Sequence, residues 1–254
     1  MTGLICPSSH PVWALQQAVD GSGAVVIVAY TDAEKLLLKI SSHRPLTDEE
    51  LEDVASLLQS VDPARLRRES FIEDAYGLLL VLGRANAVQY GHILERYLDI
   101  KDPLTVSLVL EILCLSWNRL DEFLERVIDF SLGSGWDEDE DVRHTALRIL
   151  GEYLRTLVPP YERGASECAN GQSADDTDEL PHRVRQVIKM LLNTFEDRGA
   201  TESTRGAAYL ALGRAAGKEW EELPGEWELI DGSSGGTSVD GELLGYLRNF
   251  ISSS

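Results

Sequence analysis

Apolar residues recur every three or four positions over most of this chain, which is the spacing of one face of an α-helix. The clearest example lies in residues 136–155, where a run of acids precedes an apolar stripe. The stripe consists of Val142, Ala146, Ile149, Leu150, Tyr153 and Leu154. We therefore expect a helix that begins near Val142 and buries this stripe. The acids stand at its N-terminus, where the helix dipole favours negative charge.

Similar stripes predict helices on both sides of this segment. Thr47, with Glu50 three residues later, is typical of a capping box in front of a helix. Pro103 suits the first turn of another helix, and Gly133–Gly135 ends the helix that precedes the acidic run. The expected helices cover about 48–58, 71–83, 93–98, 103–117, 120–132, 142–155, 184–195, 202–216 and 243–251. The pattern therefore predicts a series of helical hairpins.

The N-terminal segment is ambiguous. Residues 11–19 suit a short helix, whereas 24–29 are mostly β-branched and suit a strand. In a helical array, 24–29 could equally form the buried first turn of a helix that continues to Ile40. We favour the helix and assign 1–46 to an N-terminal helical cap.

The expected second helices of the hairpins end in a similar way, with leucine followed by a small residue. These ends are Leu82-Gly83, Leu113-Cys114, Leu150-Gly151 and Leu212-Gly213. The widest spacing, between the last two ends, shrinks to roughly 40 residues once an acidic loop over 159–181 is set aside, and this is the period of helical-hairpin repeats. A small residue at each end permits close helix approach.

Three motifs make the chain similar to the HEAT-repeat, armadillo-like family. They are Asp102-Pro103 before the 103–117 helix, Asp141-Val142-Arg143 with Ala146, and Thr204-Arg205 with Ala208. Cys114 in a glycine position, the missing Asp-Pro in the last two units and the acidic insertion depart from the family pattern. The resemblance implies an all-α fold, a right-handed α-solenoid of about four to five HEAT-like hairpins within 47–217. It also implies a concave face, made by the second helices, that binds macromolecules.

The segment 218–254 combines an acidic stretch, a Gly/Ser linker over 232–238 and a helix that caps the array. Trp220 and Trp227 lie among six acids in 218–231. Exposed tryptophan beside carboxylates is typical of a protein-binding hot spot. The alternative interpretation is that both tryptophans fold back over the last repeat.

Charge narrows the choice of partner. The 254-residue chain has 43 acidic and 23 basic residues and a net charge of −20. Such a charge disfavours nucleic-acid binding and favours basic protein partners. A solvated surface explains the same charge without a partner. The candidate partner-binding residues are Trp136, Asp137, Glu138, Asp139, Glu140, Asp141, Trp220, Glu221, Glu222 and Trp227.

No catalytic or metal-binding motif is apparent. The five histidines form no ligand pair, and the HEAT-like di-iron enzymes that the family includes need His-Glu pairs that this chain lacks. Cys6, Cys114 and Cys168 are far apart, and Cys114 suits helix packing. We expect no enzyme activity, no cofactor, no membrane association, a cytoplasmic location and a monomer.

The sequence thus predicts a non-enzymatic protein-binding solenoid that holds a basic partner. An immunity protein that neutralises a toxin is the narrower expectation, made by analogy from size and charge. A scaffold that bridges two partners is the first alternative. A HEAT-like DNA glycosylase or lyase is the second. Its basic residues would be the cluster of Arg65, Arg67 and Arg68 and the row of Arg143, Arg148 and Arg155 along one helix.

Overall fold

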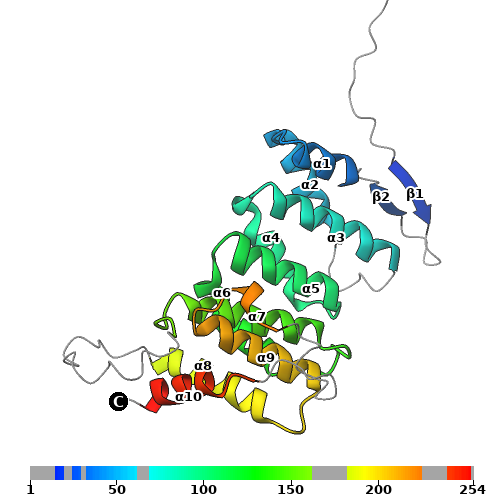
Figure 1. Cartoon of the computed structure of the whole chain (residues 1–254). Coiled ribbons are helices and arrows are strands. Elements are labelled where there is room, and N and C mark those ends of the chain that lie inside the picture. Colours follow the sequence, from blue (N-terminus) through cyan, green and yellow to red (C-terminus); the bar gives the residue numbers. More distant parts are fainter. Residues whose placement is uncertain are drawn as a thin grey trace, which may run out of the picture. The chain divides into compact units, whose positions relative to one another are not determined.

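Helices dominate the computed structural model of this chain (Figure 1). The structure describes residues 15–19, 25–29, 33–61, 69–161, 182–224 and 239–252. It divides into two compact units, Met1–Ile100 and Lys101–Ser254.

The first unit begins with a β-hairpin instead of the expected helices. Strands β1 (Leu15–Val19) and β2 (Val25–Ala29) pair antiparallel. The helices predicted over 11–19 and 24–29 are therefore wrong where the strands stand, and the 1–46 cap is not wholly helical. Val25, Val26, Ile27 and Val28 are all β-branched. Such side chains lose rotamer freedom in a helix but fit a pleated strand.

The helices of the first unit follow the expected pattern. They are α1 (Ala33–Ser41), α2 (Asp48–Ser60), α3 (Glu69–Arg84) and α4 (Gly91–Glu95), with 3₁₀ turns η2 (Val88–Tyr90) and η3 (Arg96–Asp99). Helix α3 packs against both α1 and α2. The predicted capping box of α2 is confirmed: the Glu50 N–H donates to Thr47 Oγ1 at 3.2 Å, and the Thr47 N–H donates to Glu50 Oε2 at 2.7 Å.

The second unit contains the other predicted helices. They are α5 (Pro103–Leu110), α6 (Leu120–Ser131), α7 (Asp141–Arg155), α8 (His182–Glu196), α9 (Glu202–Ala215) and α10 (Gly241–Ser252), with the π-helical η4 (Glu111–Ser116) and the 3₁₀ turn η6 (Trp220–Glu222). Asp102 caps α5 by accepting the Thr105 N–H at 2.9 Å, and Pro103 stands in the first turn as predicted. Cys114 is buried in η4, as expected for packing, and this burial raises the pKa of its thiol to about 12.

The second unit has two layers of helices. Helix α7 packs between α5 and α9, while α6 packs on α7, α8 packs on α9, and α10 contacts both α8 and α9. Most of the stripe predicted for α7 is buried between these neighbours, and Val142, Ala146, Ile149, Leu150 and Leu154 are each at most 1% exposed. Tyr153, the remaining residue of that stripe, is only half-buried. The layer α5–α7–α9 therefore keeps one side for the core and presents the other outward.

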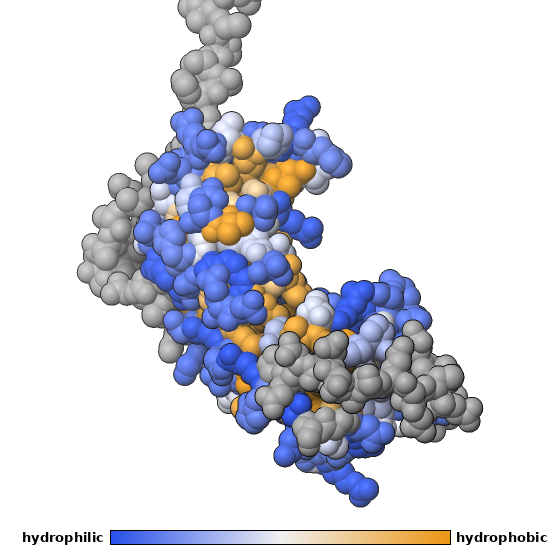
Figure 2. Space-filling view, turned by 90° about the vertical axis from the view of Figure 1, so that its left-hand side faces the viewer, coloured by the Kyte–Doolittle hydropathy of each residue, from blue (hydrophilic) through white to orange (hydrophobic). Residues whose placement is uncertain are grey.

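One face of the described part is largely polar (Figure 2). Figure 2 shows one face of the molecule, on which hydrophilic side chains predominate and hydrophobic ones gather in patches between them. None of the helices in the described ranges combines the length and apolarity that crossing a bilayer requires. Most of the predicted acidic loop and the whole Gly/Ser linker lie outside the described residues.

Candidate functional site

One side of α7 faces away from the core and carries polar residues at helical spacing. Asp141, Thr145, Arg148 and Glu152 follow one another at intervals of four, three and four residues, so their side chains share one side of the helix. The Arg148 and Glu152 side chains are 41% and 25% exposed. The candidate site lies on this side of α7.

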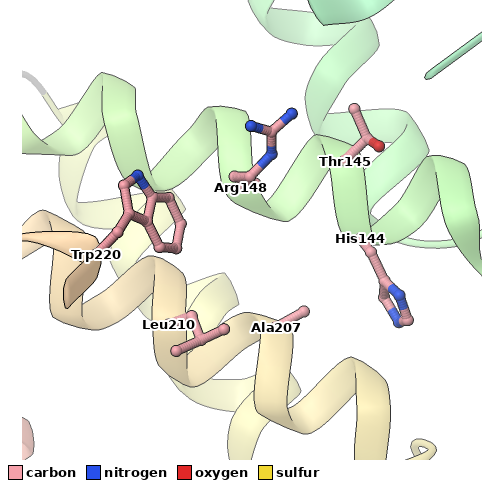
Figure 3. Close-up of a pocket in the computed structure, with 6 residues that line it drawn as sticks. All are labelled: His144, Thr145, Arg148, Ala207, Leu210 and Trp220. Atoms are coloured by element: carbon pink, nitrogen blue, oxygen red, sulfur yellow. The ribbon is translucent and has the colours of Figure 1, made fainter. Parts of the chain in front are cut away.

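A groove of about 190 Å³ lies between α7 and α9. Its lining residues are His144, Thr145 and Arg148 of α7, Ala207 and Leu210 of α9, and Trp220 of η6. Figure 3 shows the α7 and α9 side chains on opposite walls, with Trp220 towards one end and His144 towards the other. The groove therefore combines an apolar wall, an aromatic end and a polar wall.

Trp220 is held in place by the helices on which it folds back. Its indole Nε1 donates to Glu152 Oε1 at 2.9 Å, and the Arg214 guanidinium carbon lies 5.1 Å from the ring centroid. This geometry confirms the fold-back interpretation for Trp220, whereas Trp227 lies outside the described residues. The indole nevertheless lines the groove, so a partner can touch an indole that is already positioned.

Arg214, which anchors this arrangement, is only 2% exposed. Its Nε and Nη2 donate to the two oxygens of Glu152, at 2.8 and 3.0 Å. Its Nη1 donates to Glu219 Oε2 at 2.9 Å and to the Lys218 carbonyl oxygen at 2.6 Å. Burial by itself lowers the pKa of Arg214, but the hydrogen bonds and charges of Glu152 and Glu219 outweigh it and raise that pKa. The buried charge is therefore fully paired, and its role is to position η6.

The acidic turn before α7 divides into capping and exposed residues. Asp137 is only 5% exposed, and its Oδ2 accepts the N–H groups of Val142 and Arg143 at 3.0 and 3.1 Å. These bonds satisfy two of the free donors at the helix N-terminus. Asp137 is therefore a helix cap and is not accessible to a partner.

Glu140 is likewise engaged inside the protein, at φ 59° in the left-handed region. It accepts Arg143 Nη1 at 2.6 Å and Thr204 Oγ1 at 2.7 Å, and it also accepts the Thr201 hydroxyl. Burial by itself raises the pKa of Glu140, but the bonds from Thr201, Thr204 and Arg143 outweigh burial and lower it. Glu140 therefore ties the start of α7 to the start of α9.

The remaining acids of this turn, Glu138, Asp139 and Asp141, are exposed, and we call them the acidic rim. None of them makes an ion pair or side-chain hydrogen bond with a residue in the described ranges. Asp141 stands one helical turn before His144 and Thr145, so the rim leads into the groove. Trp136 is half-buried, edge-on to Phe130 at a ring-centroid distance of 6.4 Å.

The two acids of η6, Glu221 and Glu222, are both exposed. Glu222 also caps its own turn, because its Oε2 accepts the Glu219 N–H at 2.8 Å. The candidate residues thus form two groups, the rim before α7 and the η6 turn beside α9. The groove lies between them.

The Thr204 hydroxyl, which lies 3.2 Å from His144 near the groove, is not placed to act as a nucleophile. The Thr204 hydroxyl donates its only proton to Glu140. The His144 Nε2 atom, 3.2 Å from that hydroxyl, therefore acts as a donor toward it. Thr204 is also completely buried. Within the described ranges, no three His, Cys, Asp or Glu side chains are grouped as metal ligands.

Comparisons with protein-family models, with curated proteins and with solved structures find no match for this chain. The functional conclusion therefore rests on the geometry of the described residues.

The sequence pointed to the acids and to Trp220 but not to the groove or to Arg214. Arg214 and Glu152 lie far apart in the chain, on different helices. A single arginine in a helix is ordinarily assigned to the surface. The helical spacing of Asp141, Arg148 and Glu152 was the available signal for a polar side of α7.

Proposed function

We propose that this protein is a non-enzymatic binding protein whose α7–α9 face holds a basic segment of a partner protein. The observation that carries the proposal is the continuity of two features. The acidic rim of Glu138, Asp139 and Asp141 leads directly into the groove that Trp220 and Leu210 line. Lysine or arginine side chains would meet the rim, and a neighbouring apolar side chain would enter the groove.

Two physical arguments support separate roles for the acidic rim and the groove. Exposed charges contribute more to association rate and specificity than to affinity, and a net charge of −20 attracts a basic partner from a distance. Affinity then depends on buried apolar contacts, for which tryptophan is among the most effective residues. Because Glu152 and Arg214 already hold the indole, little side-chain entropy is lost when a partner contacts it.

The wider architecture that we propose is a HEAT-like solenoid. The order of α5, α7 and α9 in one layer supports it, since the resemblance places the binding face on the second helices of the hairpins. The narrower role is that of an immunity protein, for which the acidic charge is the supporting observation. A scaffold that bridges two partners is the alternative. A second groove, in the first unit, supports it, because the lining of that groove includes Arg44 and Arg84.

Affinity capture from the cells that make the protein tests the proposal. The bait proteins are the wild-type chain and a rim variant that carries Glu138→Gln, Asp139→Asn and Asp141→Asn. A matched control carries Asp48→Asn, Glu49→Gln and Glu52→Gln, which removes three exposed acids at the start of α2. We expect the wild type and the control to recover the same basic protein, and the rim variant to recover about ten-fold less of it. Equal recovery by all three baits would reject the rim as the docking surface.

A further inference from the structure

The first unit contains a groove of opposite charge to the rest of the chain. It has a volume of about 370 Å³ and lies where α1 ends, α2 begins and α3 ends. Ile40, Leu46 and Leu51 contribute apolar lining, and His43, Arg44 and Arg84 surround it. None of the described residues that line this groove is a carboxylate, in a chain with 43 acids and 23 bases.

The positive charge of this groove is not neutralised within the described residues. His43, Arg44 and Arg84 are exposed, and none of their side chains makes an ion pair or hydrogen bond there. The nearby carboxylate of Glu50 is bound by Lys39, whose Nζ lies 2.8 and 2.7 Å from its two oxygens. Burial by itself raises the pKa of Glu50, but the hydrogen bonds from Lys39 and Thr47 outweigh it and keep that pKa below its usual value.

The backbone at His43 is a second, independent feature. The N–H of His43 donates to the Ile40 carbonyl at 2.9 Å, and that of Arg44 donates to the Lys39 carbonyl at 3.0 Å. This is the Schellman arrangement at a helix end, in which glycine is usual at the left-handed position. Here that position is His43, whose φ is positive. A non-glycine residue there is strained, and such strain is typical of functional positions.

Helix dipoles explain only part of this arrangement. Cations are favoured near the C-termini of helices, and both Arg44 and Arg84 stand near such ends. Helix dipoles alone do not explain why two helix ends that carry arginines lie beside the same apolar groove. Charge complementarity and the apolar lining together define the ligand.

We propose that this groove binds a short acidic segment of a second protein that carries an aliphatic side chain. The carboxylates would pair with Arg44 and Arg84, and the aliphatic group would lie on Leu46 and Leu51. A peptide fits better than a small molecule, because the arginines are exposed and none of the described lining residues offers a buried polar side chain that would orient a small ligand. A nucleic acid fits poorly, since only two arginines line the groove, in a chain of net charge −20.

This inference does not rest on the proposed function of the α7–α9 face. Taken together, the two sites would give each unit a docking surface of opposite charge. Such a chain could hold a basic and an acidic partner at once.

The test uses a fluorescein-labelled peptide with the sequence Glu-Leu-Glu-Glu-Leu-Glu and the full chain, with binding followed by fluorescence anisotropy at about 0.15 M salt. At this ionic strength charges interact over about 8 Å, so the local cations dominate over the net charge of the chain. We expect saturable binding, and a Kd about ten-fold higher for the Arg44→Gln/Arg84→Gln variant. The Arg44→Lys/Arg84→Lys variant keeps the charge and should bind nearly as well as the wild type.

Further binding measurements distinguish specific binding in the groove from a general attraction for anions. Replacing both leucines of the peptide by serine should weaken binding, as should Leu46→Ser in the protein. His43→Gly should weaken binding while raising the midpoint of urea unfolding, because glycine relieves the backbone strain. Equal binding by the wild type and the Gln variant would overturn the proposal. So would equal competition by inorganic phosphate, or binding to phosphatidylserine vesicles without binding to the peptide.

Discussion

Gly151 of α7 lies so close to Ala211 of α9 that a Cβ atom on Gly151 would stand 2.8 Å from the Ala211 Cα atom and 3.0 Å from its carbonyl oxygen. Real Cβ atoms essentially never approach other heavy atoms within 3.0 Å, and backbone atoms cannot move aside as the end of a side chain can. The sequence predicts such close approach at the small residues that end the second helices. This contact sets the spacing between the two walls of the Trp220 groove.

Gly151→Ala should therefore destabilise the fold. We expect the free energy of unfolding to fall by about 1–3 kcal/mol, the usual cost of overpacking, in urea denaturation. Gly245→Ala in α10 is the matched control, since nothing lies within 4 Å of its would-be Cβ. The control should be neutral or stabilise by about 0.5–1 kcal/mol, because alanine is the better helix former. Equal effects of the two substitutions would mean that α7 and α9 are not in close contact.

Loss of the Glu152 carboxylate should leave the buried Arg214 guanidinium partly unpaired. Removing one partner of a buried pair typically costs about 3–5 kcal/mol, and the bonds to Glu219 and Lys218 reduce this to roughly 2 kcal/mol for Glu152→Ala. Glu219→Ala removes a half-exposed partner and should cost clearly less than Glu152→Ala, since solvent screens that charge. Thermal unfolding of both variants checks the ranking. A larger cost for Glu219→Ala would make Glu219, the residue before η6, the main anchor of Arg214.

Asp137 and Asp139 should differ in how much they contribute to the stability of the fold. Asp137→Ala removes the acceptor for two backbone N–H groups and should cost about 1–2 kcal/mol of stability. Asp139→Ala, at an exposed position, should change stability by less than about 0.5 kcal/mol. Chemical denaturation of the two variants at neutral pH distinguishes the cap from the rim. Similar losses would mean that Asp139 also serves the fold.

Glu140 should make stability depend on pH. Its pKa in the folded protein is lowered from the ordinary value of 4.5. Its contribution is therefore present above about pH 4.5 and is lost as the pH falls through the folded-state pKa. The difference in free energy of unfolding between wild type and Glu140→Gln should be largest near neutral pH. It should shrink as the pH falls below about 4.5. Urea titrations at several pH values measure this difference. A difference in free energy of unfolding that stays constant into strongly acidic solution would contradict the assigned bonds to Thr201, Thr204 and Arg143.

Most helices could be predicted because their signals are local. The Thr47–Glu50 capping box, the Asp102-Pro103 start and the apolar stripe of α7 each lie within a few turns of chain. At 25–29 two patterns disagree. The helical pattern of the neighbouring segments favours a helix, whereas the run of four β-branched residues favours the strand that the structure shows.

The candidate site could be predicted only in part, because its decisive contacts are distant in the sequence. The pairing of Arg214 with Glu152 depends on how α9 packs on α7, which no local pattern contains. Asp137 caps α7 across the turn, which includes the left-handed backbone at Glu140, whereas Asp139 stays exposed. Five consecutive acids look equivalent in the sequence, whereas the fold buries or engages two of them and exposes the rest.

Photo-crosslinking in the cells that make the protein is the most direct test of the proposed binding face. A benzoylphenylalanine residue replaces Thr145 in the groove or, as the control, the exposed Lys189 of α8, in the other helix layer. We predict a covalent adduct with a basic protein from position 145 and none from position 189. The adduct should disappear when Glu138→Gln, Asp139→Asn and Asp141→Asn are added. No adduct at 145, or equal adducts at 145 and 189, would contradict the proposed binding face.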